Sequence, residues 1–245
     1  MFSFFKKKKQ IEQRPCLKVD IHSHLIPGID DGAQSMEESL ILLRGLEEIG
    51  YKKVITTPHI MLDAYKNNRK IILSGLDDLR RVAKEEEIAL EIDAAAEYYL
   101  DDGFLDLLKE GNMLTFADDH LLFETSYVAK PMQLEEMIFA IGAAGYKPVM
   151  AHPERYRYVK DPEKEYGRLK ELGVMFQVNL NSFGGGYGKQ AQGQALFLSQ
   201  HGMIDLLGSD THHKKHVSSL GKVIQSERYS EIFENNTILN DTLLA

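Results

Sequence analysis

Short apolar runs rich in β-branched residues alternate along this chain with stretches of helical periodicity, and this alternation limits the fold more than any other feature. Seven runs have the length and composition of buried strands. Strands that alternate with helices pair in parallel, because each helix returns the chain to the same end of the sheet. We therefore predict an α/β fold whose mostly parallel sheet closes, or nearly closes, into a barrel. The runs cover residues 17–21, 54–57, 88–94, 121–124, 148–151, 174–180 and 204–207.

Most of the connecting stretches have the pattern of amphipathic helices. Residues 35–38 (Ser-Met-Glu-Glu) form a capping box, which predicts a helix that starts there and ends at Gly50. Residues 63–86 are charged and periodic, and residues 131–145 are amphipathic with a proline at the start. Residues 183–188 (Phe-Gly-Gly-Gly-Tyr-Gly) follow a strand, so we expect a mobile rim loop, with phosphate binding by its amides as the alternative.

The chain has 245 residues, and no linker or internal repeat divides it. We expect a flexible basic tail over residues 1–16 and a single domain over residues 17–245, because α/β barrels of this length form one unit. Residues 2–9 combine three phenylalanines with four lysines, which predicts at most weak contact with an anionic membrane surface. No apolar run is long enough to span a bilayer, and the start lacks the order of a signal peptide.

Charge and cysteine content exclude several classes of function. The formal net charge of −8 argues against nucleic acid as a partner, because a phosphate backbone requires a basic face. Cys16 is the single cysteine, so an intrachain disulfide framework and a cysteine-rich zinc site are both excluded. The compartment that fits is the reducing cytoplasm.

Two histidines, two residues apart, follow the first predicted strand. Side chains in a strand repeat with period two, so His22 and His24 point to the same face. Two neutral imidazoles that converge on one point are a common way to hold a transition metal. A single pair of this kind is a weak signal, and packed or surface histidines are the alternative.

Ionisable side chains also follow most of the other predicted strands. In a parallel barrel the carboxyl ends of all strands open on one face, so these side chains would meet there. Uncompensated carboxylates and imidazoles crowded together would cost several kcal/mol, and divalent cations are the simplest way to offset that cost. The residues concerned are His59, Glu97, Glu124, His152, Arg155, Asp210 and His212.

At these positions the chain resembles the polymerase-and-histidinol-phosphatase (PHP) superfamily of metallophosphoesterases. More narrowly, it is similar to the manganese-dependent tyrosine-protein phosphatases encoded with bacterial capsule and exopolysaccharide systems. The resemblance extends over about residues 19–216 and implies a distorted (β/α)7 barrel with a metal site at the carboxyl ends of its strands. The motifs that carry it are residues 20–24 (Asp-Ile-His-Ser-His), 30–32 (Asp-Asp-Gly), 57–59 (Thr-Pro-His), 97–99 (Glu-Tyr-Tyr), Glu124, 152–155 (His-Pro-Glu-Arg) and 209–212 (Ser-Asp-Thr-His).

The resemblance also implies three divalent metal ions, with manganese favoured and iron or zinc as alternatives. Asp30 competes with Asp31 for one ligand position, and the motif favours Asp31. By this carry-over, one ion is held by His22, His24 and Asp210 and shares Glu97 with a second ion held by Glu124 and His152, while the third takes Asp31, His59 and His212.

The family pattern fails in one place. Related phosphatases carry a second arginine a few residues beyond the last histidine, whereas here Lys214 and Lys215 occupy that region. A lysine supplies charge without a bidentate fork. We therefore expect Arg155 to bind the phosphoryl oxygens, with Lys214 and Lys215 as further candidates. The proton for the leaving group would come from His212, His216 or a metal-bound water.

Three functions compete. The resemblance implies a cytoplasmic protein-tyrosine phosphatase that acts on a phosphotyrosine protein, specifically a bacterial tyrosine kinase that regulates capsule or exopolysaccharide synthesis. The first alternative is a small-molecule phosphomonoesterase of the same fold, such as a histidinol-phosphate phosphatase. The second is a non-catalytic regulatory module of a polysaccharide-export assembly. The complete ligand set argues against that module, and the oligomeric state stays open.

Overall fold

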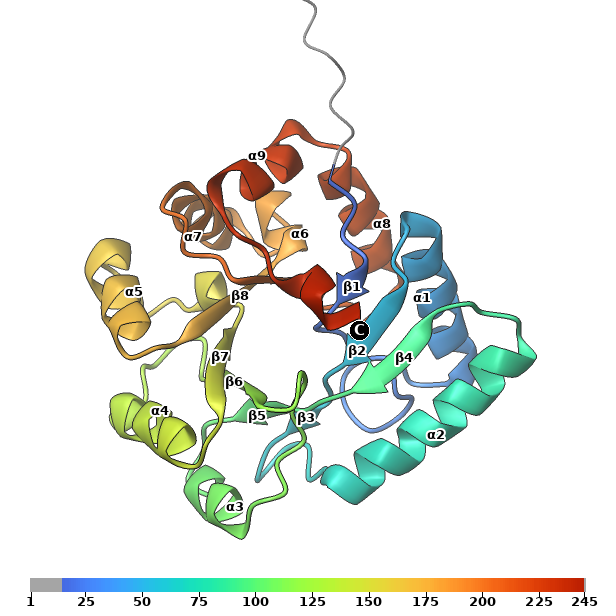
Figure 1. The fold of residues 1–245 in the computed structure, drawn as a ribbon, viewed down its shortest axis with the longest axis horizontal. Coiled ribbons are helices and arrows are strands. Elements are labelled where there is room, and N and C mark those ends of the chain that lie inside the picture. The colour runs from blue at the N-terminus through green and yellow to red at the C-terminus, as the bar shows by residue number, and fades with distance from the viewer. Residues whose placement is uncertain (1–14, 245) are drawn as a thin grey trace, which may run out of the picture.

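Parallel strands lie in the middle of the molecule and helices surround them (Figure 1). The computed structural model describes residues 15–244, so most of the predicted basic tail, with its expected membrane contact, lies outside the described residues. One sheet has the order β1-β2-β4 and the other the order β3-β5-β6-β7-β8-β9, and every neighbouring pair is parallel. The strands are β1 (Val19–Asp20), β2 (Lys53–Thr56), β3 (His59–Ile60), β4 (Glu91–Ala94), β5 (Glu97–Tyr99), β6 (His120–Glu124), β7 (Lys147–Ala151), β8 (Met175–Asn179) and β9 (Leu206–Gly208).

The seven predicted strand positions are confirmed, and two of them are broken. The second continues after a two-residue break as β3, and the third continues as β5. Pro58 lies in the first break and has no amide to donate to a ladder. The breaks transfer His59 and Glu97 to the larger sheet, where they are direct cross-strand neighbours.

The first and last strands meet without forming a regular ladder. Ser23 and Thr211, just beyond β1 and β9, form an isolated parallel bridge. On the amino-terminal side, the Asn240 side chain donates to the carbonyls of Val19 and Leu207 and accepts from the Leu207 amide, at 2.7–2.9 Å. The described residues therefore form two parallel sheets with a side-chain link between their outer strands.

The described residues also form nine helices and two 3-10 turns, of which α8, α9 and η2 follow the last strand. Helix α1 confirms the predicted cap, because the Ser35 hydroxyl accepts from the Glu38 amide and Gly50 ends the helix at φ 114°. Helix α2 begins later than predicted, because the Asn68 side chain caps it by accepting from the Ile71 amide. The elements are α1 (Met36–Ile49), α2 (Arg69–Glu85), α3 (Phe104–Glu110), α4 (Leu134–Ala143), η1 (Pro153–Arg155), α5 (Pro162–Glu171), α6 (Leu180–Phe183), α7 (Lys189–Gln200), α8 (Lys214–Ile224), α9 (Glu227–Asn235) and η2 (Asn240–Leu244).

Two apolar clusters support the strand ends. The larger one packs the helices against the outside of the sheets. The smaller one is drawn from alternate positions of facing strands, such as Val149 and Ala151 of β7. Packing there holds the strands firmly beneath the polar residues that follow them. Within residues 15–244, no helix has both the length and the apolar character needed to cross a bilayer.

Candidate metal centre

His22 and His24 follow β1, are fully buried, and bring their Nε2 atoms within 3.3 Å of each other, as the spacing predicts. The Nδ1 of His22 donates to the Gln177 side-chain oxygen at 2.6 Å. The Nδ1 of His24 donates to the Asp30 carboxylate at 2.8 Å. A hydrogen on Nδ1 leaves the Nε2 lone pair of each neutral ring free to bind a metal. Asp30 therefore orients a histidine, and Gln177 is a positioning residue that the sequence analysis missed.

Glu97 lies at the centre of the cluster. The histidine nitrogens of His22, His24, His59 and His152 approach its carboxylate at 2.9–3.5 Å. Glu97 is fully buried, and neither of its oxygens has a hydrogen-bond partner within the described part of the chain. A buried carboxylate without hydrogen bonds is costly unless a cation compensates it.

Glu124 ends β6 and lies between two of the predicted ligands. Its Oε1 is 2.9 Å from His59 Nδ1, and its Oε2 is 3.8 Å from His152 Nε2. The carry-over grouped Glu124 with His152 and the shared Glu97, whereas the structure places Glu124 closer to His59 than to His152. Glu124 Oε1, His59 Nδ1 and His152 Nδ1 are further buried atoms without a hydrogen-bond partner in residues 15–244.

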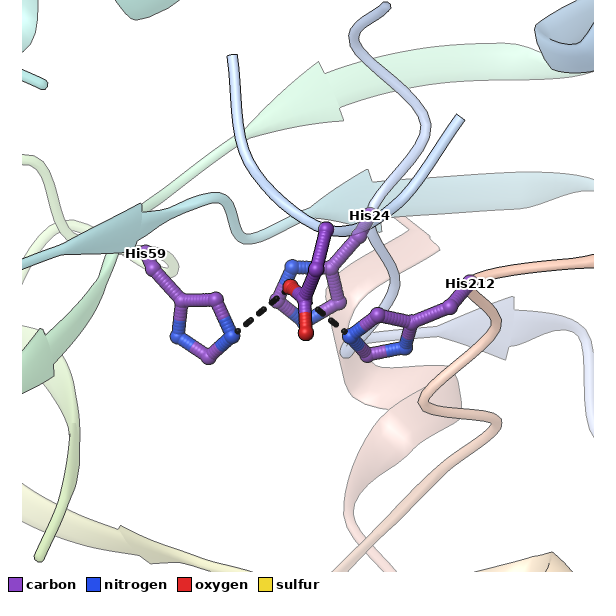
Figure 2. A group of neighbouring side chains, drawn as sticks. His24, His59 and His212 are labelled. Carbon is purple, nitrogen blue, oxygen red and sulfur yellow. Dashed lines mark ion pairs between the residues drawn. The ribbon is translucent and has the colours of Figure 1, made fainter. Parts of the chain in front are cut away.

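Asp31 completes a second corner of the cluster. Figure 2 shows His24, His59 and His212 around one carboxylate, and the two dashed ion pairs join Asp31 Oδ1 to the Nε2 atoms of His59 and His212, each 3.4 Å long. His212 Nδ1 donates to the Asp210 carbonyl at 3.0 Å, which directs Nε2 toward this corner. The geometry supports the predicted choice of Asp31 over Asp30, because Asp30 is occupied with His24.

Asp210 follows β9 and is buried beside His22 and His24, with its Oδ1 3.5 and 3.6 Å from their Nε2 atoms. Both Asp210 and His152 adopt left-handed backbone conformations, at φ 49° and 34°. Residues other than glycine rarely adopt this conformation, and it is concentrated at functional sites. Here it accompanies two side chains that point into the cluster.

The electrostatics describe a site built for cations. Burial disfavours the charged form of His22, but Glu97 and Asp210 outweigh it and raise the pKa of His22 to about 9. Burial and the neighbouring imidazole of His212 lower the pKa of His24 to about 4. Contacts with His212 and His59 hold the pKa of Asp31 well below its ordinary value. The neighbouring histidines likewise hold the pKa values of Glu97 and Asp210 below their ordinary values, so these three carboxylates stay ionised and attract positive charge.

The donor set fits divalent metals. Imidazole nitrogens and carboxylate oxygens, without thiolate, are the ligands of manganese, iron and zinc sites. All nine predicted ligands fall into four overlapping groups, and the donor atoms within each group lie within 4.8 Å of one another. His22, His24, His59 and Glu97 each belong to two of these groups. These groups are His22–His24–Asp210, His22–Glu97–His152, His59–Glu97–Glu124 and His24–Asp31–His59–His212.

Arg155 lies over the cluster and is held on three sides. Its Nη1 donates to Asp210 Oδ2 at 2.8 Å, and its guanidinium lies 4.6 Å from the ring centre of Tyr127 and 4.2 Å from that of Tyr187. These cation–π contacts fix the guanidinium plane. Asn179 and Tyr187 also donate to Asp210 Oδ2.

A cavity of about 330 Å³ opens above these groups. Six of the predicted ligands line it, together with Arg155, Tyr127, Tyr187, His213 and His216. We call it the metal-lined cavity. Its walls combine carboxylates, imidazoles and one guanidinium. Cations held by the carboxylates and imidazoles, together with the guanidinium, would suit an anionic ligand.

The comparisons with known proteins agree with this chemistry. Residues 18–237 match the protein family described as "Capsular polysaccharide synthesis, CpsB/CapC". The chain belongs to this family. The tyrosine-protein phosphatase YwqE of Bacillus subtilis (strain 168) is 29% identical over 219 residues, which cover 87% of this chain and 86% of the relative. The tyrosine-protein phosphatase CpsB of Streptococcus pneumoniae is 29% identical over 202 residues, which cover 80% of this chain and 83% of the relative.

Solved structures extend the match to three dimensions. A crystal structure from a study of YwqE and CpsB, described as unique metal-dependent tyrosine phosphatases, aligns with a TM-score of 0.78 and 28% identity over 90% of this chain and 96% of the other. A histidinol phosphate phosphatase from Lactococcus lactis aligns with a TM-score of 0.52 at 11% identity over 85% of this chain and 93% of the other, and shares the fold alone. The predicted resemblance to the phosphatases of capsule systems is confirmed.

In this CpsB/CapC family member, the two lysines predicted as further phosphate-binding candidates lie beside the metal-lined cavity and not in its wall. Lys214 and Lys215 begin helix α8, are exposed, and line a neighbouring cavity, whereas His213 and His216 face the metal-lined one. Tyr187 comes from the glycine-rich segment, which the analysis expected to be a mobile loop. A tyrosine among glycines was the one sequence signal for it.

Proposed function

We propose that this chain is a metal-dependent protein-tyrosine phosphatase, the activity named in its curated relatives. The observation that carries the proposal is Glu97, a buried carboxylate that four histidines approach and that lacks hydrogen bonds in the described structure. Glu97 lines the same cavity as Arg155. Cys16, the single cysteine, is exposed and is not among the residues that line the metal-lined cavity. A phosphatase with a cysteine nucleophile does not fit.

We assign three divalent ions to the cluster, with manganese favoured over iron or zinc. The overlap between the four donor groups supports shared ligands, with Glu97 between two ions. The assignment keeps the sequence-based sets: His22, His24 and Asp210 for the first ion, Glu97, Glu124 and His152 for the second, and Asp31, His59 and His212 for the third.

Bound divalent ions would neutralise the phosphoryl oxygens and lower the pKa of a water molecule from about 15.7 toward 7. Arg155 would meet the equatorial phosphoryl charge that builds up during in-line attack. The rings of Tyr127 and Tyr187 hold the Arg155 guanidinium in place before the substrate binds. His216, which lines the metal-lined cavity, would donate a proton to the phenolate oxygen, because Nε2 of His212 is assigned to the third ion and its Nδ1 donates to the Asp210 carbonyl. Tyrosine requires less of this help than an aliphatic alcohol, because its phenol has a pKa of about 10.

The remaining assignments are also proposals. We propose that the two sheets are parts of one distorted (β/α)7 barrel over residues 17–245, supported by the link between β1 and β9. The substrate would be a phosphotyrosine protein, specifically a bacterial tyrosine kinase of capsule or exopolysaccharide synthesis, supported by the family description. We place the protein in the cytoplasm, where such a kinase presents phosphotyrosine and where the free thiol of Cys16 is stable.

The test is metal content and turnover measured on the same samples. Chelation with EDTA should abolish hydrolysis of phosphotyrosine peptides, because it removes the divalent ions from the cluster. Added Mn²⁺ should restore hydrolysis, because the deprotonated ligands can bind it again. His152→Ala should lose metal and activity together. His201→Ala is the matched control, because His201 is exposed at the end of α7. It should keep both.

Two results would contradict the proposal in different ways. Full turnover by protein shown to be free of metal would end the metal hypothesis. Hydrolysis of histidinol phosphate far faster than of every phosphotyrosine peptide would leave the metal site standing and favour the small-molecule phosphatase instead.

A further inference from the structure

A second cavity, of about 550 Å³, adjoins the metal-lined cavity. The two share Asp31, His212 and His213 in their walls. Beyond these residues, the second cavity runs between the start of α1 and the start of α8. We call it the lysine groove. Because the two cavities share these wall residues, a peptide bound over the metal cluster can continue into the lysine groove without crossing the core of the protein.

Positive charge gathers on one side of the lysine groove. Lys214 and Lys215 are exposed, and neither ammonium group lies within 4.0 Å of a carboxylate elsewhere in residues 15–244. Two carboxylates also line the groove. Glu38 accepts from the Gln34 amide at 2.8 Å, and Asp31 contacts His59 and His212 at 3.4 Å, whereas the two lysines have no such partner among the described residues. The groove therefore offers two cations to a ligand of opposite charge.

An apolar side chain forms part of the wall of the groove. Ile41 is 48% exposed and lines the groove. The two walls are held close to each other further along α1 and α8. A Cβ atom added at Gly45 would lie 2.6 Å from Val217 Cγ1, so the helices approach as closely as a glycine allows. The groove is a built feature of the helix pair.

We propose that the lysine groove binds the peptide segment that flanks phosphotyrosine, with acidic side chains facing Lys214 and Lys215 and an apolar side chain on Ile41. This proposal rests on the proposed function. An extended peptide advances about 3.3 Å per residue, so residues next to the phosphotyrosine reach the groove while the phosphoryl group lies over the metal cluster. The lysines that stand near the family's second arginine position would thus select the sequence around the phosphotyrosine.

Steady-state kinetics on two phosphotyrosine peptides tests this. One peptide carries Asp and Glu on both sides of the phosphotyrosine, and the other carries Ser and Gln there. The wild-type protein should prefer the acidic peptide, and the preference should shrink at high salt because exposed charges are screened. The compared quantity is the kcat/KM for the acidic peptide divided by the kcat/KM for the neutral peptide. In the double variant Lys214→Glu, Lys215→Glu this ratio should fall about tenfold, mainly because the KM for the acidic peptide rises.

Lys222→Glu is the matched control, because it makes the same charge reversal on α8 outside the groove. It should keep the wild-type ratio. An unchanged ratio in the double variant would overturn the groove and leave the phosphatase standing. An equal loss on both peptides would also overturn it, since the lysines would then serve the phosphoryl group itself.

A binding measurement tests the lysine groove independently of the proposed phosphatase activity. The same two peptides with a non-hydrolysable phosphonate in place of the phosphate can be titrated against the Mn²⁺-loaded protein by fluorescence anisotropy. Tighter binding of the acidic peptide that disappears in the double variant would support the groove even without turnover. Equal affinities of wild-type protein for the two peptides would overturn it.

Discussion

Side chains that are not themselves predicted metal ligands fix the orientation of those that are. Gln177 and Asp30 each hold one histidine by Nδ1, and Asp210 is held by donors from η1, from β8 and from the loop between α6 and α7. Its Oδ2 accepts from Arg155, Asn179 and Tyr187 at 2.7–3.1 Å. Such outer partners fix ring orientation and raise ligand basicity. Arg155 thus has two roles, one toward Asp210 and one toward the metal-lined cavity.

Replacement of Arg155 should separate catalysis from metal binding. Arg155→Ala should lower kcat by about 10²–10³-fold, because a positioned donor to developing charge is lost. Metal content should stay near the wild-type level, since Asn179 and Tyr187 still hold Asp210. Kinetics paired with elemental analysis checks both. Unchanged kcat in a fully loaded Arg155→Ala protein would remove Arg155 from the reaction.

Short connections between elements place the ligands more than the elements themselves do. The break at Pro58 moves His59 beside Glu97 in the larger sheet, and the turn at residues 30–33 folds back against His24. In that turn the Ala33 amide donates to the His24 carbonyl at 3.1 Å. Close backbone approach of this kind leaves no room for a side chain at the preceding position, Gly32.

Gly32→Ala should therefore disrupt the Asp31 corner. A Cβ at Gly32 would lie 2.2 Å from the His24 carbonyl oxygen and 2.4 Å from His24 Cβ, so the turn must shift. We expect lower metal stoichiometry and at least a tenfold loss of activity, measured by elemental analysis and peptide hydrolysis. Gly142→Ala is the control, because nothing lies within 4 Å of its Cβ in α4. It should stabilise the protein by about 0.4–1 kcal/mol and keep activity. Wild-type metal content in Gly32→Ala would show that the turn does not position Asp31.

Across the whole molecule, the two ends of the domain meet between β1 and β9. The Asp20 carboxylate accepts from the amide and hydroxyl of Ser209 at 2.8 and 2.6 Å, and Asp241 accepts from the Lys18 amide at 2.7 Å. The buried Asn240 side chain then supplies the hydrogen bonds that a regular ladder would have made there. The last described helix, η2, is thereby part of the strand framework.

Asn240→Ala should lower global stability. The change leaves the carbonyls of Val19 and Leu207 and the Leu207 amide without a protein partner, at a cost of about 2–4 kcal/mol. For a chain of this size the midpoint of thermal unfolding should fall by about 5–15 °C. Asn235→Ala, at an exposed position on α9, should change it little. Equal midpoints for the two variants would contradict a structural role for Asn240.

Patterns that depend on neighbouring residues were readable from the sequence. Period-two spacing predicted that His22 and His24 converge, and strand–helix alternation predicted the parallel order of the strands. The cap at Ser35 and the end at Gly50 were predicted for the same reason, because each depends on contacts within one turn of chain. Family motifs supplied the nine predicted ligands, and the structure brings all nine together.

Contacts between distant segments were decided only by the tertiary structure. Nothing local distinguishes Tyr127 from a surface tyrosine, yet packing places its ring, together with that of Tyr187, against the guanidinium of Arg155. The orientation of α8 turns Lys214 and Lys215 into the lysine groove and His216 into the metal-lined cavity, although all three lie within one turn of helix. Local sequence determines which residues reach the strand ends, because backbone periodicity is a short-range property. The side chains that face one another there depend on how separate elements pack.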